Sequence, residues 1–304
     1  MKNIDQSIQQ RLLNMSRDQN EDFQLILIRF GLERFLYRLS TSKYSEQFVL
    51  KGAFLFKLWT NFRFRPTKDI DLLGLGDSSP EHLKAIFKEI CVNKVEPDGI
   101  VFDESSIRVT EIREEQEYGG SRVKLMGLLG KAKIPLQVDI AYGNAITPKT
   151  EEHDFPSMLG MPSPRIRTYP KETVVAEKLQ SMVRLGMQNS RMKDFFDLFW
   201  MAMLFSYEGP VLAKAIQSTF KRRKTNIPST PPLVFSDEFA TDSVKRSQWK
   251  AFLNKNSIPS MSDNFEDIIK NLRDFLAPPF KAAATENNFL FLWSSEKGWH
   301  PKRH

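Results

Sequence analysis

The sequence is poor in the residues that build disulfides, redox centres and zinc sites. Cys91 is its single cysteine among 304 residues, which excludes an internal disulfide and a cysteine-cluster metal site. Such a low cysteine content is typical of a protein in a reducing cytosol. The four histidines are scattered, without an H-x-x-x-H pair, so the sequence gives no indication of a zinc hydrolase.

Long apolar segments are missing as well. The longest apolar run, Leu198 to Phe205, is far shorter than the roughly 18 residues that a membrane-spanning helix needs. The polar start does not resemble a signal peptide. Hydrophobic residues nevertheless make up 41% of the chain and charged residues 27%, a composition typical of folded proteins. We therefore expect a cytoplasmic protein with no membrane association, folded as one large domain or two ordinary ones.

The net charge of +7 is unevenly distributed. Residues 1–168 contain 24 Lys and Arg against 23 Asp and Glu, whereas residues 169–304 contain 20 against 14. The excess of +6 in the second half is consistent with a polyanionic partner such as nucleic acid, and also with an ordinary basic surface.

Hydrophobic periodicity predicts two helices in the first forty residues and a third, buried on all sides, from Phe48 to Thr60. The segment Asp69 to Gly76 is short, branched and bounded by glycine, which predicts a central strand. Glu81 to Val92 should be helical. The alternating segments Ser121 to Leu129 and Ile134 to Tyr142 predict an antiparallel hairpin.

A stretch rich in proline and serine, Pro156 to Pro170, has the composition of a linker or covering loop. Beyond it, helices are expected at Lys171–Leu185, Ser190–Phe205, Pro210–Lys221, Ser243–Leu253 and Asp263–Leu276. The expected fold class is α+β, with a small mixed sheet in a first domain over residues 1–165 and an all-helical second domain over residues 166–304.

Two acidic residues, Asp69 and Asp71, stand at the entrance of the predicted strand. Residues i and i+2 of a strand point to the same side, so both carboxylates face one point. Close carboxylates repel each other, and a divalent cation between them relieves the repulsion. A solvated strand end is the alternative explanation of the D-x-D pattern.

Asp139 lies in the apolar run Leu136 to Ala141, where alternation places it on the face opposite Val138 and Ile140. If its strand lies beside the Asp69 strand, three carboxylates converge, enough to hold two metal ions for phosphate chemistry. The alternative is a surface-facing aspartate on a half-exposed sheet.

Three further charged residues form a pattern that two explanations fit. Asp194 and Asp197 are three residues apart on one predicted helix, and Lys178 is on the previous helix. If the helices pack antiparallel, the lysine reaches a carboxylate or projects toward bound phosphates. An ordinary salt bridge between helices is the alternative.

Four successive cations, Lys221, Arg222, Arg223 and Lys224, end another predicted helix. They complement the helix dipole, or they bind RNA phosphates, in which case binding should weaken steeply with salt.

Three segments together resemble a known superfamily. Lys51-Gly52-Ala53, then Arg65-Pro66-Thr67-Lys68-Asp69-Ile70-Asp71, then Val138-Asp139-Ile140 resemble the polymerase-β-like nucleotidyltransferases. A later block, Glu177-Lys178 followed by Arg191 to Leu198 (RMKDFFDL), is similar to the E-K…R-x-x-D-x-x-D-L block of the AbiEii/AbiGii toxin nucleotidyltransferases. The resemblance covers roughly Phe48 to Trp200, and it implies a small mixed sheet with helices followed by a helical domain.

The resemblance also implies roles for individual residues. Asp69 and Asp71 would bind the metal, and Asp139 would be the third carboxylate, acting as ligand or base. Lys178 would contact the nucleotide phosphates and be oriented by Asp194 or Asp197. The superfamily's Gly-Ser is Gly52-Ala53 here, so the serine hydroxyl is missing. The remaining candidates for holding phosphate are Lys51, the backbone amides at Gly52, Arg65 and Thr67.

The function implied is an Mg²⁺- or Mn²⁺-dependent transfer of a nucleoside monophosphate from an NTP to an acceptor, with tRNA or another RNA as the leading candidate. By resemblance the chain would be the toxin of a bacterial toxin–antitoxin or phage-defence pair, with a cognate antitoxin as partner. The alternatives are a small-molecule or protein acceptor, or a catalytically silent nucleotide- or RNA-binding protein, for which Ala53 is the supporting feature.

Overall fold

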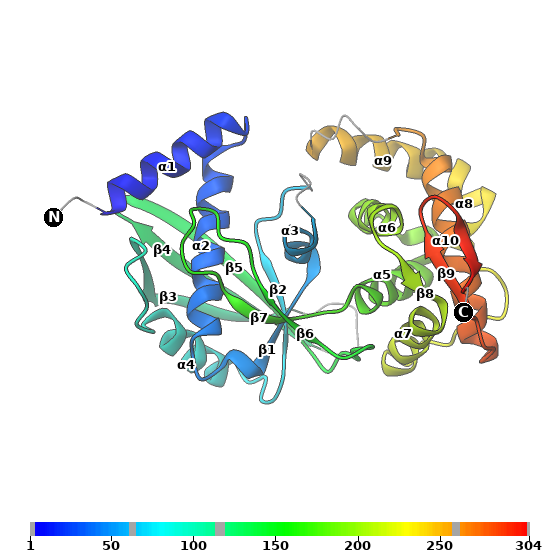
Figure 1. Cartoon of the computed structure of the whole chain (residues 1–304), viewed down its shortest axis with the longest axis horizontal. Coiled ribbons are helices and arrows are strands. Elements are labelled where there is room, and N and C mark those ends of the chain that lie inside the picture. Colours follow the sequence, from blue (N-terminus) through cyan, green and yellow to red (C-terminus); the bar gives the residue numbers. More distant parts are fainter. Residues whose placement is uncertain (1–3, 61–64, 113–118, 257–261, 303–304) are drawn as a thin grey trace. The chain divides into compact units, whose positions relative to one another are not determined.

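The computed structural model describes residues 4–60, 65–112, 119–256 and 262–302. The chain divides into two compact units (Figure 1). The first comprises residues 1–143 and 151–169, and the second comprises residues 144–150 and 170–304. The strand β7 (Arg165–Thr168) belongs to the first unit, so the division falls after this strand and not at the expected position 165.

The first unit is an α+β structure. Its helices are α1 (Ile4–Asp18), α2 (Phe23–Ser40), α3 (Leu55–Trp59) and α4 (Pro80–Cys91). Its other strands are β1 (Phe48–Lys51), β2 (Ile70–Gly74), β3 (Ile100–Ile112), β4 (Gly120–Leu129), β5 (Ala132–Tyr142) and β6 (Glu151–Asp154). All seven strands form one mixed sheet in the order β3-β4-β5-β2-β1-β7-β6. Within it, β5 runs antiparallel to β4 and parallel to β2.

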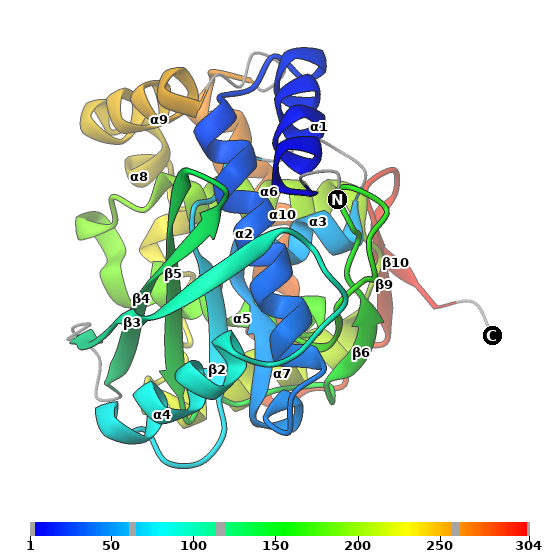
Figure 2. The same ribbon diagram turned by 90° about the vertical axis from the view of Figure 1, so that its left-hand side faces the viewer.

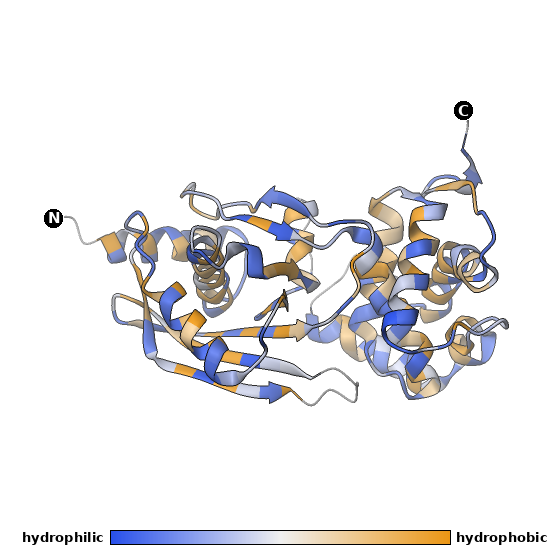
Figure 3. Ribbon diagram, turned by 90° about the horizontal axis from the view of Figure 1, so that it is seen from below, coloured by the Kyte–Doolittle hydropathy of each residue, from blue (hydrophilic) through white to orange (hydrophobic). Residues whose placement is uncertain are grey.

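One face of this sheet is covered by α2, which runs across the strands (Figure 2). A Cβ atom added at Gly31 would lie 3.0 Å from Leu136 of β5, so the helix approaches this strand closely. Val138 and Ile140 share the side of Leu136 and are buried. Asp139, between them, points to the other side and is only half-buried. Figure 3 shows the same alternation of hydrophobic and hydrophilic residues along the strands.

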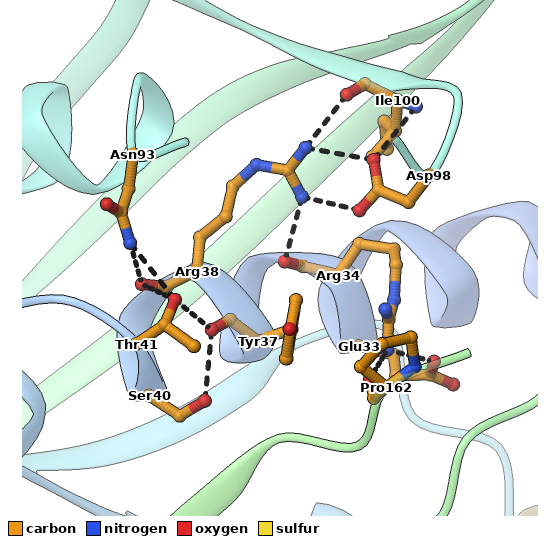
Figure 4. Close-up of polar contacts among 10 residues, drawn as sticks. All are labelled: Glu33, Arg34, Tyr37, Arg38, Ser40, Thr41, Asn93, Asp98, Ile100 and Pro162. Carbon is orange, nitrogen blue, oxygen red and sulfur yellow. Dashed lines mark hydrogen bonds and ion pairs between the residues drawn. The ribbon is translucent and has the colours of Figure 1, made fainter. Parts of the chain in front are cut away.

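A buried ion pair fixes the second half of α2 to the edge of the sheet (Figure 4). Arg38 donates hydrogen bonds to both carboxylate oxygens of Asp98, at 2.7 and 2.9 Å, and to the carbonyl oxygen of Ile100 at 3.0 Å. Asn93 donates to the carbonyl oxygen of Arg38 at 3.0 Å. Because buried charges must be paired, these bonds specify where β3 begins relative to α2.

The prediction of a single helix from Phe48 to Thr60 is wrong. The segment forms strand β1, a single 3₁₀ turn over Gly52–Phe54 and the short helix α3. Strand β1 lies between β2 and β7 and is buried on both faces, which gives it the continuous apolar run that a buried helix also has. The two expected helices before it, the helix α4, the strand β2 and the β4–β5 hairpin are all present.

The second unit is mainly helical. Its helices are α5 (Lys171–Leu185), α6 (Met192–Leu204), α7 (Gly209–Arg222), α8 (Asp237–Thr241), α9 (Ser243–Asn256) and α10 (Phe265–Thr285). Strands β8 (Tyr207–Glu208), β9 (Phe291–Ser294) and β10 (Gly298–Pro301) form a small antiparallel sheet. The five expected helices are present, whereas α8 and the small sheet were not predicted. No helix in the described parts of either unit is long and apolar enough to cross a membrane.

Candidate active site

A row of four charged side chains crosses adjacent strands of the large sheet. Asp71 of β2 lies directly opposite Asp139 of β5 and, on its other side, directly opposite Lys51 of β1. Arg122 of β4 lies directly opposite Asp139. Paired residues on neighbouring strands point to the same face of a sheet, so the four side chains follow one another at intervals of about 5 Å. The β2–β5 pairing is the condition under which the carboxylates were expected to converge.

Asp69 is the residue immediately before β2, two positions from Asp71. The hydroxyl of Thr67 donates a hydrogen bond of 2.8 Å to Oδ1 of Asp69. In this structure Thr67, a predicted phosphate-binding residue, therefore orients the first carboxylate of the D-x-D pattern.

The turn after β1 brings the backbone against the second carboxylate. Gly52 has a φ of +73°, and a Cβ atom added there would overlap with the carboxylate of Asp71. Both the backbone conformation and the space therefore require glycine. The segment Lys51-Gly52-Ala53 is thus in contact with the D-x-D strand, as a phosphate-binding turn beside a metal-binding pair would have to be. The ammonium of Lys51 lies 5.3 Å from the ring centroid of Tyr169, which follows β7.

The third carboxylate is held by an arginine. Arg122 donates from Nε to Oδ1 of Asp139 at 2.8 Å and from Nη2 to Oδ2 at 2.7 Å. Gln137 adds a longer contact of 3.3 Å to Oδ2. The hydrogen bond to Asp139 raises the pKa of Arg122 against the effect of burial, and the charges of Asp139, Asp69 and Asp71 raise it further. The guanidinium therefore lies within the electrostatic field of all three carboxylates.

Asp71 and Asp139 lie on one face of the sheet, but the described residues contain no group of three or more His, Cys, Asp or Glu side chains arranged as metal ligands. The Arg122 guanidinium bonds to both oxygens of Asp139, while Asp69 and Asp71 share one strand entrance. Two carboxylates beside a glycine backbone fit a hard divalent cation such as Mg²⁺, which prefers oxygen ligands and needs few from the protein.

A cavity of about 520 Å³ opens next to this strand entrance. Three predicted nucleotide-binding residues, Ala53, Arg65 and Thr67, line it. Its volume lies within the range of small-molecule sites, roughly 300–1,000 Å³. Arg29 and Lys57 also line the cavity, together with the carboxylates of Glu21 and Glu33.

Two titratable groups in this cavity have shifted pKa values. Burial lowers the pKa of Lys57 from 10.5 to about 7, the charge of Arg29 lowers it further, and the charges of Glu21 and Glu33 oppose the shift. Burial raises the pKa of Glu33, although its bonds to Arg34 and to the backbone N–H of Met158 oppose the shift. A bound anionic group would favour the charged form of Lys57, because it would offset the burial of the ammonium.

In the second unit, Lys178 of α5 links two buried aspartates of α6. Its Nζ donates to Oδ1 of Asp194 and to Oδ2 of Asp197, each at 2.7 Å. The two carboxylates are 2% and 0% exposed. The salt bridge between helices is therefore present, and the phosphate-contacting role of Lys178 stays a prediction.

Asp194 accepts a second cation. Arg191 donates from Nε to its Oδ2 at 2.7 Å. Burial alone would raise the pKa of Asp194, but the charges of Lys178 and Arg191 lower it well below its ordinary value. Both oxygens of this aspartate are thus engaged by cations, and the carboxylate is ionised at neutral pH.

The basic cluster at the end of α7 is divided. Lys221, Arg222 and Lys224 are exposed. Arg223 is 13% exposed, donates to Oε1 of Gln180 at 2.8 Å and pairs with Glu177 at 3.4 Å, both on α5. Arg223 therefore anchors α7 to α5, and the three exposed cations remain the candidates for RNA contact.

Sequence reasoning missed two residues that the fold brings to the candidate site, Arg122 and Lys57. A signal for Arg122 was the hairpin itself, because a two-residue loop at Gly130 and Lys131 places Arg122 opposite Asp139. Lys57 follows Ala53 by four residues, but its place in a presumed long helix concealed its position in a cavity.

The profile of the family described as nucleotidyl transferase AbiEii toxin, type IV TA system, matches residues 34–271. No functionally curated protein matches the sequence. Among solved structures, JHP933 from Helicobacter pylori is similar at 17% identity and a TM-score of 0.44, over 84% of this chain and 90% of that one. A second H. pylori protein, provisionally assigned as a nucleotidyltransferase, is similar at 17% identity and a TM-score of 0.41, over 84% and 93% of the chains.

The family match covers most of the chain, including the D-x-D strand, Asp139 and the Lys178 block. The predicted enzyme class, nucleotidyltransferase, and the predicted toxin–antitoxin context are those of this family. This chain belongs to the AbiEii nucleotidyltransferase toxin family of type IV toxin–antitoxin systems.

Proposed function

We propose that this chain transfers a nucleoside monophosphate from an NTP to a hydroxyl group of RNA, with tRNA as the first candidate, in a reaction that requires Mg²⁺ or Mn²⁺. It would act in the cytoplasm as the toxin of a pair and be neutralised by its cognate antitoxin. The observation that carries the proposal is the register that places Asp139 beside Asp71, with Asp69 two residues before Asp71.

The carboxylates divide the work. Asp69 and Asp71 would hold the divalent cation. The cation, when bound, would offset the negative charge of the triphosphate and of the leaving pyrophosphate. Asp139 would accept the proton of the attacking hydroxyl or act as a third ligand. A bond forms between the acceptor oxygen and the α-phosphorus, and the bond between the α- and β-phosphates breaks.

The nucleotide would occupy the cavity beside the D-x-D strand. The positions of Ala53, Arg65 and Thr67 in its wall support this assignment. Lys51 and the backbone of Gly52 would bind phosphate oxygens at the turn in contact with Asp71. In the second unit, Lys178 would contact phosphate while Asp194 and Asp197 hold it in place, and Lys221, Arg222 and Lys224 would contact RNA.

The proposal is tested by incubating the purified protein with each α-labelled NTP, Mg²⁺ or Mn²⁺, and total tRNA. We expect label in RNA from at least one NTP. The Asp71→Ala variant should lose the activity, and its thermal unfolding verifies that it is still folded. An active Asp71→Ala protein would contradict the metal-binding role.

The acceptor is tested in the same experiment with total protein and with small metabolites in place of tRNA. Label in either of these pools and not in RNA would replace the RNA acceptor while keeping the chemistry. No transfer to any pool, together with NTP binding, would indicate a silent nucleotide-binding protein.

A further inference from the structure

The guanidinium of Arg122 is bonded to Asp139, the carboxylate proposed to act as base or third metal ligand. Its Nε and Nη2 bond to the two different oxygens of Asp139, a parallel two-bond geometry that is among the stronger forms of ion pair. A carboxylate engaged in this way has lone pairs left, but the adjacent positive charge opposes the approach of a second cation.

The strand register, and not only the choice of side-chain rotamers, brings Arg122 and Asp139 together. Arg122 and Asp139 are directly opposite in the β4–β5 ladder, whose strands are joined by only two residues, with Gly130 at a φ of +57°. Since the hairpin loop sets the register, the guanidinium and the carboxylate stay within reach of each other in every state that keeps the hairpin.

The same guanidinium acts on the D-x-D pair. Arg122 lies opposite Asp139, which in turn lies opposite Asp71, so only one strand separates the guanidinium from the proposed metal site, and its positive charge weakens the negative potential there. Arg122 is 38% exposed, which leaves room for it to swing away from Asp139.

We propose that Arg122 is a positioning residue that orients Asp139 and competes with the divalent cation for it, so that the carboxylate face binds metal weakly while the ion pair is closed. This inference rests on the proposed function, because it takes Asp69 and Asp71 as the primary metal ligands. The consequence is that Arg122 lowers the metal affinity that the carboxylates have in the absence of NTP.

The test is Mn²⁺ binding to the full-length protein without NTP, measured from the electron paramagnetic resonance signal of free Mn²⁺. Arg122→Gln should bind Mn²⁺ about fivefold more tightly than the wild type, the upper end for a partly exposed ion pair. Arg122→Lys keeps the charge and loses the two-bond geometry, so its affinity should lie between the two, about twofold above the wild type.

The matched control is Lys124→Gln. Lys124 is exposed, lies on the same strand and the same side as Arg122, and faces Gln137, not a carboxylate, across the ladder. Its removal changes the net charge equally, so its effect on Mn²⁺ affinity measures the general electrostatic contribution. Equal affinities of Arg122→Gln and Lys124→Gln would overturn the proposal.

A failure of the proposed function has a different signature. If Asp71→Asn binds Mn²⁺ as well as the wild type does, the metal site is elsewhere, and the role of Arg122 falls with it. If Asp71→Asn loses Mn²⁺ while Arg122→Gln leaves the affinity unchanged, the metal site stands and the competition is wrong. Thermal unfolding of each variant verifies the fold, and Arg122→Lys carries the test if Arg122→Gln does not fold.

Discussion

Lys57 shows how a single residue can report on what the cavity binds. Its ammonium is buried beside Arg29, and the two carboxylates that oppose the shift, Glu21 and Glu33, have cation partners of their own in Arg29 and Arg34. The pKa of about 7 places its loss of charge in the physiological range. A bound anionic group would offset the cost of burying this ammonium, so Lys57 makes the cavity a candidate site for an anionic ligand.

This shift predicts a pH dependence of stability. The folded-state pKa of Lys57 is about 7 and the ordinary value is 10.5, so between these values the unfolded chain binds more protons and stability rises with pH. We expect Lys57→Met to be more stable than the wild type below pH 7, and the advantage to shrink steadily as pH approaches 10.5. Urea unfolding at pH 6, 8 and 10 measures the difference.

The comparison of variant and wild type at each pH cancels the titration of the groups that do not interact with Lys57. An advantage of Lys57→Met that is constant from pH 6 to 10 would mean that Lys57 titrates normally. Saturating inorganic triphosphate should also stabilise the wild type more than the variant, because it favours the charged amine.

Helices α5 and α6 are joined by buried ion pairs, and removing one partner lowers the stability of the fold strongly. Lys178 is the partner of both Asp194 and Asp197, and both aspartates are buried. Removing one partner of a buried ion pair leaves an uncompensated charge and costs about 3–5 kcal/mol. Stability and catalysis are therefore mixed in any Lys178 variant, and they have to be measured separately.

We expect Lys178→Met to lower the free energy of unfolding by about 3–5 kcal/mol. Adding Asp194→Asn and Asp197→Asn removes the buried charges, so the triple variant should recover most of the loss. Transfer activity per folded molecule, measured where all proteins are folded, should be low in both. Normal activity per folded molecule would assign Lys178 to the fold alone.

The elements show which parts of the fold a sequence can predict. The helices of the second unit have a hydrophobic stripe with the period of a helix, and α5 was predicted with its observed ends. Strand β1 was not predicted, because it is buried on both faces and therefore lacks the alternation of apolar and polar residues that distinguishes a strand. Strand β3 alternates less regularly, with a register shift between Asp103 and Arg108, and was missed.

The candidate site also combines residues that local sequence patterns predict with residues that they do not. Asp69, Asp71 and Asp139 were predicted because the i, i+2 and alternation rules act within one strand. The partner of Asp139 depends on hairpin register, and starting the second strand at Ile134 instead of Ala132 changes which residue faces it. A shift of two residues keeps every side chain on its face, so hydrophobic alternation could not have corrected it.

At the scale of the molecule, the basic excess belongs to the second half of the sequence. Residues 169–304 carry the net +6, but not every cation there is available to a polyanion. Arg223 pairs with Glu177 and Gln180, and Lys178 and Arg191 pair with Asp194. Lys221, Arg222 and Lys224 are exposed, whereas the Arg223 side chain is only 13% exposed, so these three residues are a sharper candidate for RNA contact than the full run of four.

If these three residues contact RNA, then Lys221→Gln, Arg222→Gln and Lys224→Gln together should weaken tRNA binding and flatten its salt dependence. Each lost phosphate contact reduces the slope of log affinity against log salt by about 0.7 to 0.9. NTP binding should not change, because Lys51, Asp71 and the cavity belong to the first unit. The measurement is a titration with tRNA at several salt concentrations.

Arg223→Gln is the matched control within the same run. Its guanidinium is engaged with α5, so its loss should lower the thermal stability of the protein and leave the salt slope unchanged. Equal slopes for the triple variant and the wild type would remove the cluster from the RNA site, since a charge that complements only the helix dipole releases no counterions from RNA. Other cations of the chain would then have to bind the acceptor. Lys193 is exposed on α6 beside Asp194, and its variants would be titrated next.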